Sequence, residues 1–232
     1  MTNLVSKASV HAFYVDAIRH GKNTAENLQA PTSERFNSFL ESIREGTPQT
    51  ALDLGCGAGN HSIAMARAGY FVVAVDQVPS LLLLRHLEAQ GDWRHRIDVR
   101  ESLVEEYSID HGFGIVVARD VLHYLSKPDV VSVLESAVAN AHSSSHHYLE
   151  VFTSITRRSR DGRLRKMEGE AGYSPESFGR LIERLYHGWD VALFWDEHAE
   201  KDSRTGENCF EAIRVTVIAS NTSTRSGTGK SS

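Results

Sequence analysis

Short apolar segments alternate with amphipathic segments through most of the chain. The apolar segments are β-branched and short, which is typical of strands buried on both faces of a parallel sheet. They predict strands at 50–54, 71–75, 96–100, 114–118 and 148–152. Helices are predicted in the intervening segments, from residue 60 to Gly69, from Ser80 and from Lys127. Repeated β-α units of this kind predict a doubly wound sheet with helices on both faces.

Other elements flank this alternation. Phe36, Phe39, Leu40 and Ile43 are spaced at i, i+3, i+4 and i+7, which predicts a helix with one apolar face after Pro31-Thr32-Ser33. Another helix is predicted from Ser174-Pro175 to Gly188. Strands predicted at 190–197 and 209–219 are joined by a polar turn and should form an antiparallel hairpin. The fold class expected is therefore α/β, with a Rossmann-like, mostly parallel, seven-stranded sheet that ends in this hairpin.

The order of these segments suggests three parts of the chain. Residues 1–30 are polar with scattered aromatics and predict a helix and loop that could act as a lid. Residues 31–220 carry the sheet, and residues 221–232 form a tail rich in Ser, Thr and Gly that is expected to be disordered. A length of 232 residues fits one such domain with additions.

Composition narrows the classes of partner. The net charge of −5 argues against a nucleic-acid surface, and no apolar run approaches the roughly 18 residues of a membrane helix. Two cysteines give neither a disulfide framework nor zinc-ligand spacing, and no signal peptide is visible. These features predict a cytoplasmic protein that binds neither nucleic acid nor a membrane, and a monomer or homodimer is expected.

A glycine-rich motif directly follows the first predicted strand. Asp53 is followed by glycines at 55, 57 and 59, and Asp76 ends the next strand, 21 residues after Gly55. Alternate glycines let backbone amides approach a nucleotide-like ligand at a helix N-terminus. An acid about 20 residues farther on is placed to accept ribose hydroxyls. Asn60 stands where a dinucleotide fingerprint has its third glycine, which disfavours an NAD dehydrogenase.

The segment Asp53-Leu54-Gly55-Cys56-Gly57-Ala58-Gly59-Asn60, with Asp76, resembles motif I of the class I S-adenosylmethionine (SAM)-dependent methyltransferases. The likeness spans roughly residues 31–220. It is greatest to the small-molecule branch that includes tellurite-resistance and thiopurine-type enzymes, whose carboxy-terminal part is similar to residues 186–190 and 196–198. The chain departs from that pattern at residues 141–146, where related chains carry a Lys-Pro-Gly-Gly turn.

The resemblance implies a SAM site at the carboxyl ends of the strands. Asp53 would meet the α-amine, and Asp76 would bind the ribose. Glu101 and Ser102 would lie near the adenine amino group, although an exposed loop carboxylate is an equal alternative for Glu101. The full set of cofactor-binding candidates is Asp53, Gly55, Cys56, Gly57, Gly59, Asp76, Gln77, Glu101, Ser102, Ala118 and Arg119.

Catalytic candidates are fewer, because methyl transfer from a sulfonium has a built-in leaving group and needs no general-base motif. Arg119 and Asp120 follow the fourth strand, where related enzymes line the transfer site. His123 is expected to be a packed histidine. His142, His146 and His147 are close in sequence, but a serine turn and strand alternation argue against a metal site.

The sequence is compatible with several functions. Methyl transfer to a small-molecule acceptor is the main hypothesis. The alternatives are cyclisation of SAM to azetidine-2-carboxylate with release of methylthioadenosine, as in azetidine-2-carboxylate synthase-like members, and a module that binds SAM without turnover. Tyr14, Asn27, Tyr173 and Ser203 are available for cyclisation, Tyr14 and Tyr173 being the catalytic candidates. The basic run 157–166 could recognise an anionic substrate, form a mobile lid or be a solvated loop.

Overall fold

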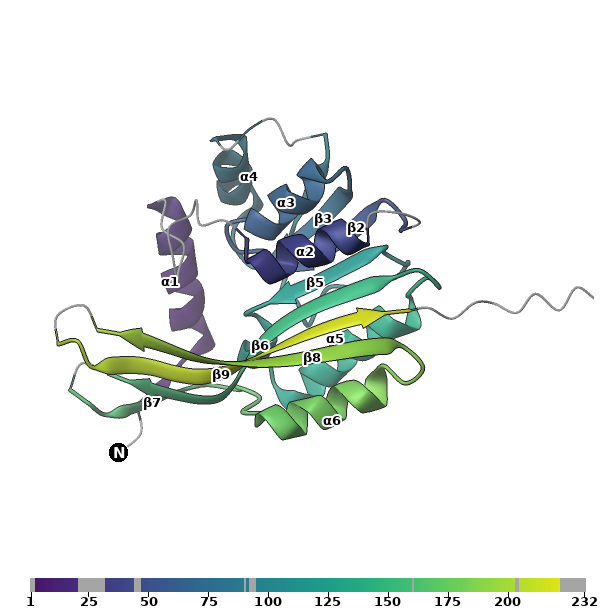
Figure 1. Ribbon diagram of the computed structural model, residues 1–232. Helices are drawn as coiled ribbons and strands as arrows, with labels where there is room; N and C mark the ends of the chain where they lie inside the picture. The colour runs from purple at the N-terminus through teal and green to yellow at the C-terminus, as the bar shows by residue number, and fades with distance from the viewer. Residues whose placement is uncertain are drawn as a thin grey trace, which may run out of the picture.

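The computed structural model describes residues 3–20, 32–43, 47–89, 91, 95–159, 161–202 and 205–221. The strands of this part form one mixed sheet with helices on both faces (Figure 1). The strands are β1 (Asn3–Val5), β2 (Thr50–Leu54), β3 (Phe71–Asp76), β4 (Ile97–Glu101), β5 (Ile115–Arg119), β6 (His146–Arg158), β7 (Leu164–Met167), β8 (Asp190–Lys201) and β9 (Asn208–Ser220). The α-helices are α1 (Lys7–Arg19), α2 (Glu34–Ser42), α3 (Asn60–Arg67), α4 (Ser80–Ala89), α5 (Lys127–Ala139) and α6 (Pro175–Leu185).

The sheet has the predicted parallel core and the predicted terminal hairpin. Neighbouring strands run β4-β3-β2-β5-β6 in parallel, and β9 then pairs antiparallel with β6 on one side and with β8 on the other. These strands correspond to the seven predicted from the sequence. Two short strands, β1 and β7, are additional. The Rossmann-like fold class is therefore confirmed, with an extension that the apolar pattern did not indicate.

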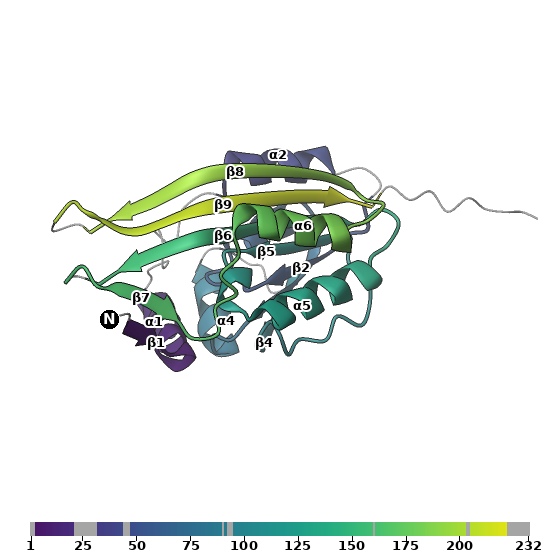
Figure 2. The same ribbon diagram turned by 90° about the horizontal axis from the view of Figure 1, so that it is seen from below.

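Two apolar cores lie on opposite faces of the sheet. Helices α2, α3 and α4 cover one face, and α5 and α6 cover the other (Figure 2). The predicted apolar face of α2 is buried there, with Phe36 fully enclosed against Tyr148 of β6 at a ring distance of 5.1 Å. Ser33 caps α2 by accepting a hydrogen bond from the amide of Phe36. Such caps satisfy amides that the helix itself leaves unpaired.

Four strands extend past the end of the parallel core as a curved arm (Figure 1). We call this part, residues 152–167 and 196–214, the β-arm. β5 stops opposite Glu150, whereas β6 continues to Arg158 against β9 and then turns back as β7. Residues 157–158 and 164–166 of the basic run 157–166 are therefore strand, because β6 and β7 pair with each other and with β9 and β1.

A β-bulge interrupts β6 at the base of the β-arm. The register against β9 shifts between Thr153 and Thr156, and Ser154 has a φ of 49°. A bulge adds one residue to one strand and so changes which face the following side chains occupy. As a result, side chains on either side of this bulge reach the same face despite an odd separation in sequence.

Helix α1 stands at the carboxyl edge of the parallel strands, beside α4 (Figure 1). It is the helix expected within residues 1–30, although the loop expected after it lies outside the described residues. The expected tail also lies outside them from residue 222 onward. Across the described ranges, no helix combines the length and the apolar character needed to cross a bilayer.

Candidate functional site

The carboxyl ends of β2, β3 and β5 open into a cavity of about 1010 Å³. Helix α1 forms one wall, and the β-arm forms the far end. Pockets for one drug-sized ligand are about 300–1,000 Å³. The volume is therefore sufficient for a cofactor and a small second molecule side by side.

The predicted glycine loop forms one end of this cavity. The amide of Gly57 donates to Oδ2 of Asp76 at 2.8 Å, which fixes the loop against the end of β3. Gly55 has a φ of 68°, and a Cβ there would lie 2.4 Å from a methyl carbon of Val121. A Cβ on Gly57 would meet no protein atom within 4 Å, although its φ is 55°. The space beside Gly57 is thus open for a ligand to approach the backbone closely.

Asp53 lies beneath this loop at the end of β2 and is only 2% exposed. Ser62 of α3 donates a hydrogen bond to its Oδ2 at 2.6 Å. Burial raises the pKa of Asp53 to about 6, a rise that the hydrogen bond from Ser62 only partly opposes. A buried carboxyl of this kind is stabilised in its ionised form by a cation, so the site favours a positively charged ligand group.

Most of the predicted site residues line this cavity together. They are Tyr14, Asp53, Gly55, Cys56, Gly57, Asp76, Gln77, Arg119 and Asp120. Gly59 instead serves as the N-cap of α3, with a left-handed backbone conformation. Glu101 accepts a hydrogen bond from the amide of Ser80, and Ser102 bonds the carbonyl of Leu103. The cavity is lined beside them by Leu103 and Val104, which the sequence analysis did not single out.

Two further candidates are held in the core instead. Ala118 is fully buried within β5. Tyr173 packs its ring on Phe178 of α6 at 5.5 Å, with the ammonium group of Lys127 over its face. Neither residue is among those that line the cavity. Tyr14, in contrast, reaches the cavity from α1 and shares a 2.7 Å hydrogen bond with the hydroxyl of Tyr124.

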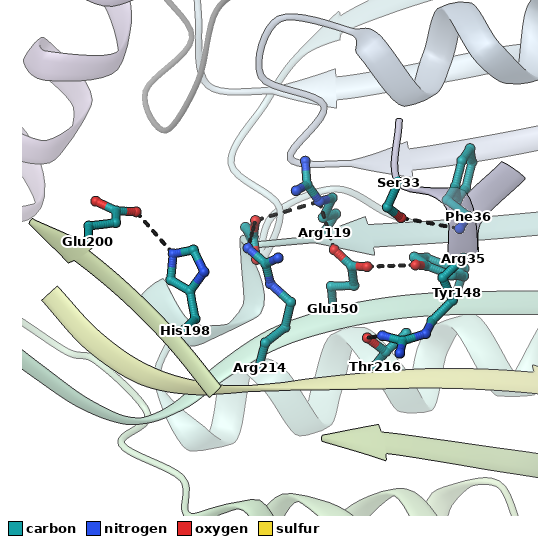
Figure 3. Close-up of polar contacts among 11 residues, drawn as sticks. Ser33, Arg35, Phe36, Arg119, Tyr148, Glu150, His198, Glu200, Arg214 and Thr216 are labelled. Atoms are coloured by element: carbon teal, nitrogen blue, oxygen red, sulfur yellow. Dashed lines mark hydrogen bonds and ion pairs between the residues drawn. The ribbon is translucent and has the colours of Figure 1, made fainter. Parts of the chain in front are cut away.

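A polar network fixes Arg119 at the middle of the cavity (Figure 3). Its Nε donates to Glu150 at 2.7 Å, and the hydroxyl of Tyr148 donates to the other carboxylate oxygen at 2.6 Å. Burial would raise the pKa of Glu150, but these two partners together lower it. Glu150 is therefore ionised, and it holds the guanidinium of Arg119 in place.

Asp120 follows Arg119 in an unusual backbone conformation. Its φ is 53°, and its amide donates to the carbonyl of Glu150 at 2.8 Å. Its Oδ2 contacts Arg214 at 3.4 Å, while its Oδ1 is buried without a hydrogen-bond partner among the described residues. Burial raises the pKa of Asp120 despite the nearby guanidinium groups. Left-handed conformations of non-glycine residues are often retained at functional sites.

Aromatic and cationic side chains line the β-arm end of the cavity. Phe152 is at the centre of this group, with the guanidinium of Arg214 at 4.6 Å and the rings of His198 and Phe210 at 4.9 and 5.1 Å. This group was not predicted from the sequence, although Arg157 belongs to the basic run 157–166. These residues belong to three different strands, so only the pairing of β6, β8 and β9 brings them together.

The histidines have separate environments. His123 is buried in the cavity wall against Tyr124 and Phe152, as expected of a packed residue. Burial lowers the pKa of His123 to about 3, so it is neutral. His147 bonds the hydroxyl of Tyr186, whereas His146 faces Ser220. The described residues contain no cluster of three or more His, Cys, Asp or Glu side chains arranged to hold a metal.

Residues 51–142 match a protein family described as a methyltransferase domain. This match includes the glycine loop, Asp76 and Asp120. The chain is also 31% identical over 127 residues to a magnesium-protoporphyrin O-methyltransferase from Rhodobacter capsulatus, which covers 55% of this chain and 52% of that protein. The chain thus spans about half the length of this curated relative.

Solved structures with a similar fold cover more of the chain. A 1,6-didemethyltoxoflavin-N1-methyltransferase from Burkholderia thailandensis superposes with a TM-score of 0.57 at 15% identity, covering 93% of this chain and 88% of its own. The N-methyltransferase NodS from Bradyrhizobium japonicum gives a TM-score of 0.57 at 14% identity, covering 90% and 99%. Both were solved with S-adenosylhomocysteine (SAH). At these identities the likeness concerns the fold.

Proposed function

We propose that this chain, whose residues 51–142 match a methyltransferase domain, is a class I SAM-dependent methyltransferase that transfers the methyl group of SAM to a small-molecule acceptor. The observation that carries the proposal is the hydrogen bond between the Gly57 amide and Asp76 beside an open cavity. It forms a glycine cradle next to two strand-end carboxylates. The names of two similar proteins also refer to small molecules, magnesium-protoporphyrin and 1,6-didemethyltoxoflavin.

The residues at the glycine-loop end fit the chemical groups of SAM. Asp53, buried and with a raised pKa, faces the position suited to the cationic α-amine. Each oxygen of Asp76 already accepts one backbone amide, from Gly57 and Val78, and a carboxylate oxygen can accept a second hydrogen bond. Leu103 and Val104 offer an apolar wall for the adenine.

When bound, SAM supplies a methyl group on a cationic sulfonium, and an acceptor lone pair displaces it in line. The chain contributes position and exclusion of water. Arg119, fixed by Glu150, orients charged groups at the middle of the cavity. Asp120 lines the cavity, and its Oδ1 has no hydrogen-bond partner among the described residues. Its raised pKa suits it to accept the proton that an acceptor hydroxyl or amine releases.

The alternative of cyclisation has less support in the described residues. Of its candidate side chains, Tyr14 lines the cavity and Tyr173 does not. Asn27 and Ser203 lie outside the described residues. Incubating the purified protein with SAM, with and without a mixture of hydroxy- and aminoaromatic acceptors, separates the hypotheses by product.

We expect SAH to form only when an acceptor is present. Methylthioadenosine without an acceptor would support cyclisation instead. Tight SAM binding with neither product would favour a non-catalytic module. A chain that folds but binds neither SAM nor SAH would exclude all three functions.

A further inference from the structure

The β-arm end of the cavity differs in charge from the glycine-loop end. Asp53 and Asp76 dominate the glycine-loop end. The β-arm end contributes four guanidinium groups against three carboxylates to the cavity wall. The guanidinium groups belong to Arg157, Arg158, Arg165 and Arg214, and the carboxylates to Asp120, Glu168 and Glu200. The glycine-loop end would therefore complement a cationic cofactor, and the β-arm end would complement an anionic second molecule.

We propose that this end binds a planar acceptor that carries a carboxylate, a proposal that rests on the methyltransferase function proposed above. The binding surface is a group of four side chains, Phe152, Arg157, Phe210 and Arg214, which we call the Arg-Phe cradle. The two phenyl rings meet at an angle of 74° and form an aromatic corner against which a planar ring can pack. The guanidinium groups provide planar donors for a carboxylate.

Strand register builds the cradle from two Arg-Phe pairs. Phe152 is directly opposite Arg214 across β6 and β9, and Arg157 is directly opposite Phe210. The Arg214 guanidinium lies 4.6 Å from the ring of Phe152, and that of Arg157 lies 5.4 Å from the ring of Phe210. The two phenyl rings themselves are 5.1 Å apart. All four side chains therefore occupy one face of the β-arm.

The bulge in β6 is what brings Arg157 to that face. Phe152 and Arg157 are five residues apart, an odd separation that would place them on opposite faces of a regular strand. Their partners Arg214 and Phe210 are four apart and share a face. The extra residue between Thr153 and Thr156, where Ser154 has a φ of 49°, corrects the alternation. Bulges beside active sites commonly redirect a side chain in this way.

Both guanidinium groups keep hydrogen-bonding capacity for a ligand. Arg157 donates to Glu170 through Nη1 at 2.7 Å, and Arg214 reaches Asp120 through Nη2 at 3.4 Å. Nη2 of Arg157 and Nε of Arg214 are buried, and neither has a hydrogen-bond partner in the described part of the chain. Buried donors without partners are rare in native proteins and call for an explanation. A small reorientation toward a bound carboxylate would satisfy both donors.

The test measures binding of 2-naphthoate, 2-naphthamide and decahydro-2-naphthoate to the protein–SAH complex by calorimetry. A charge-assisted hydrogen bond contributes enough to expect about tenfold tighter binding of 2-naphthoate than of the amide. The saturated acid should also bind more weakly than 2-naphthoate, because it lacks a planar face. Equal affinity for the acid and the amide would overturn the preference for a carboxylate. Equal affinity for the two acids would overturn the packing of a planar ligand against the aromatic corner.

Substitutions in the Arg-Phe cradle test whether its arginines cause the preference for the acid over the amide. Arg157→Gln and Arg214→Gln should each reduce the preference for acid over amide to about threefold or less. Arg157→Lys and Arg214→Lys, which keep the charge without the planar fork, should retain part of it. Arg163→Gln is the matched control, since Arg163 is exposed at the β6–β7 turn and does not line the cavity.

Binding of SAH separates this proposal from the proposed function. Each variant should bind SAH as the wild type does, which shows that it is folded. If SAH binds but the acid is not preferred, the cradle proposal fails and the methyltransferase proposal stands. If the wild type binds 2-naphthoate but not SAH, the proposed function fails, and the cradle proposal, which rests on it, fails with it. An acid preference that survives both Arg→Gln substitutions would also contradict the assignment.

Discussion

Backbone amides and buried carboxylates form the glycine-loop end of the cavity, whereas guanidinium and aromatic side chains from long strands form the β-arm end. The first end uses residues close in sequence, and its glycines leave space where a ligand can touch the backbone. The second uses residues from β6 and β9 that meet through cross-strand pairing. Under the proposed function, the cofactor site is thus built from residues close in sequence, and the acceptor surface is built separately by strand pairing.

The two ends also differ in how their charges are compensated. Asp53 accepts hydrogen bonds from the hydroxyl and the backbone amide of Ser62, yet burial still raises its pKa, so its negative charge is poorly offset. Arg157 is paired with Glu170, and its Nη2 has no hydrogen-bond partner among the described residues. Ligand binding at the glycine-loop end should therefore depend strongly on pH. Ligand binding at the β-arm end should depend mainly on the shape of the ligand.

The largest expected effect concerns stability and Asp53. A folded-state pKa of about 6, above the unfolded value near 4, means that the folded protein binds this proton more tightly. The free energy of unfolding should therefore fall by about 2 kcal/mol as pH rises from 4 to 6 on account of this residue, out of about 3 kcal/mol over its full titration. Urea denaturation of the wild type and Asp53→Asn across this range measures the difference. Parallel pH profiles for the two proteins would show that Asp53 is not the carboxyl whose pKa is raised by folding.

The next effect concerns Asp76 and the cofactor. Asp76→Ala should weaken SAH binding by about 1–3 kcal/mol, because it removes charge-assisted hydrogen bonds to the ribose and frees the Gly57 amide. Calorimetric titration gives the dissociation constant. Asp98→Ala is the matched control, since Asp98 is exposed on the neighbouring strand β4 and does not line the cavity. An unchanged constant for Asp76→Ala would refute the ribose assignment.

A smaller effect follows from the charge of the ligand. SAM should bind about tenfold more weakly at pH 5 than at pH 7, because its α-ammonium favours ionised Asp53, whose pKa is about 6. Titration of the Asp53→Asn variant over the same range is the comparison. A variant that keeps the full pH dependence would move the effect to another group.

The smallest effect concerns the bulge. Ser154→Gly should raise the free energy of unfolding by up to about 1 kcal/mol, because glycine adopts the positive φ without strain. SAH binding should not change, since Ser154 belongs to the β-arm and not to the glycine loop. Thermal denaturation and calorimetry measure the two quantities. A loss of SAH affinity in this variant would mean that the two ends are coupled.

The contrast between the ends explains what could be predicted from the sequence. The order of elements followed from apolar periodicity, and the glycine loop followed from a local motif with Asp53 and Asp76. Both depend on neighbours in sequence, which a single chain displays directly. Asp120 was identified from its place after a strand, although its left-handed conformation was not foreseen.

The β-arm was not predictable by the same means. Arg157 and Arg158 appear in a run of basic residues that resembles a solvated loop. Only the pairing of Arg157 with β9 and of both residues with β7 makes them part of a strand. The bulge that redirects Arg157 has no local signature, because Thr153-Ser154-Ile155-Thr156 alternates as an ordinary strand would. Tyr173, a catalytic candidate from the sequence, packs against Phe178 in the core.

The most direct measurement is a calorimetric titration of the folded 232-residue chain with SAH. We predict saturable binding at one site per chain, which weakens in Asp76→Ala and persists in Arg214→Gln. No heat of binding from a protein shown to be folded, or binding that Asp76→Ala leaves intact, would contradict the placement of the cofactor at the glycine loop.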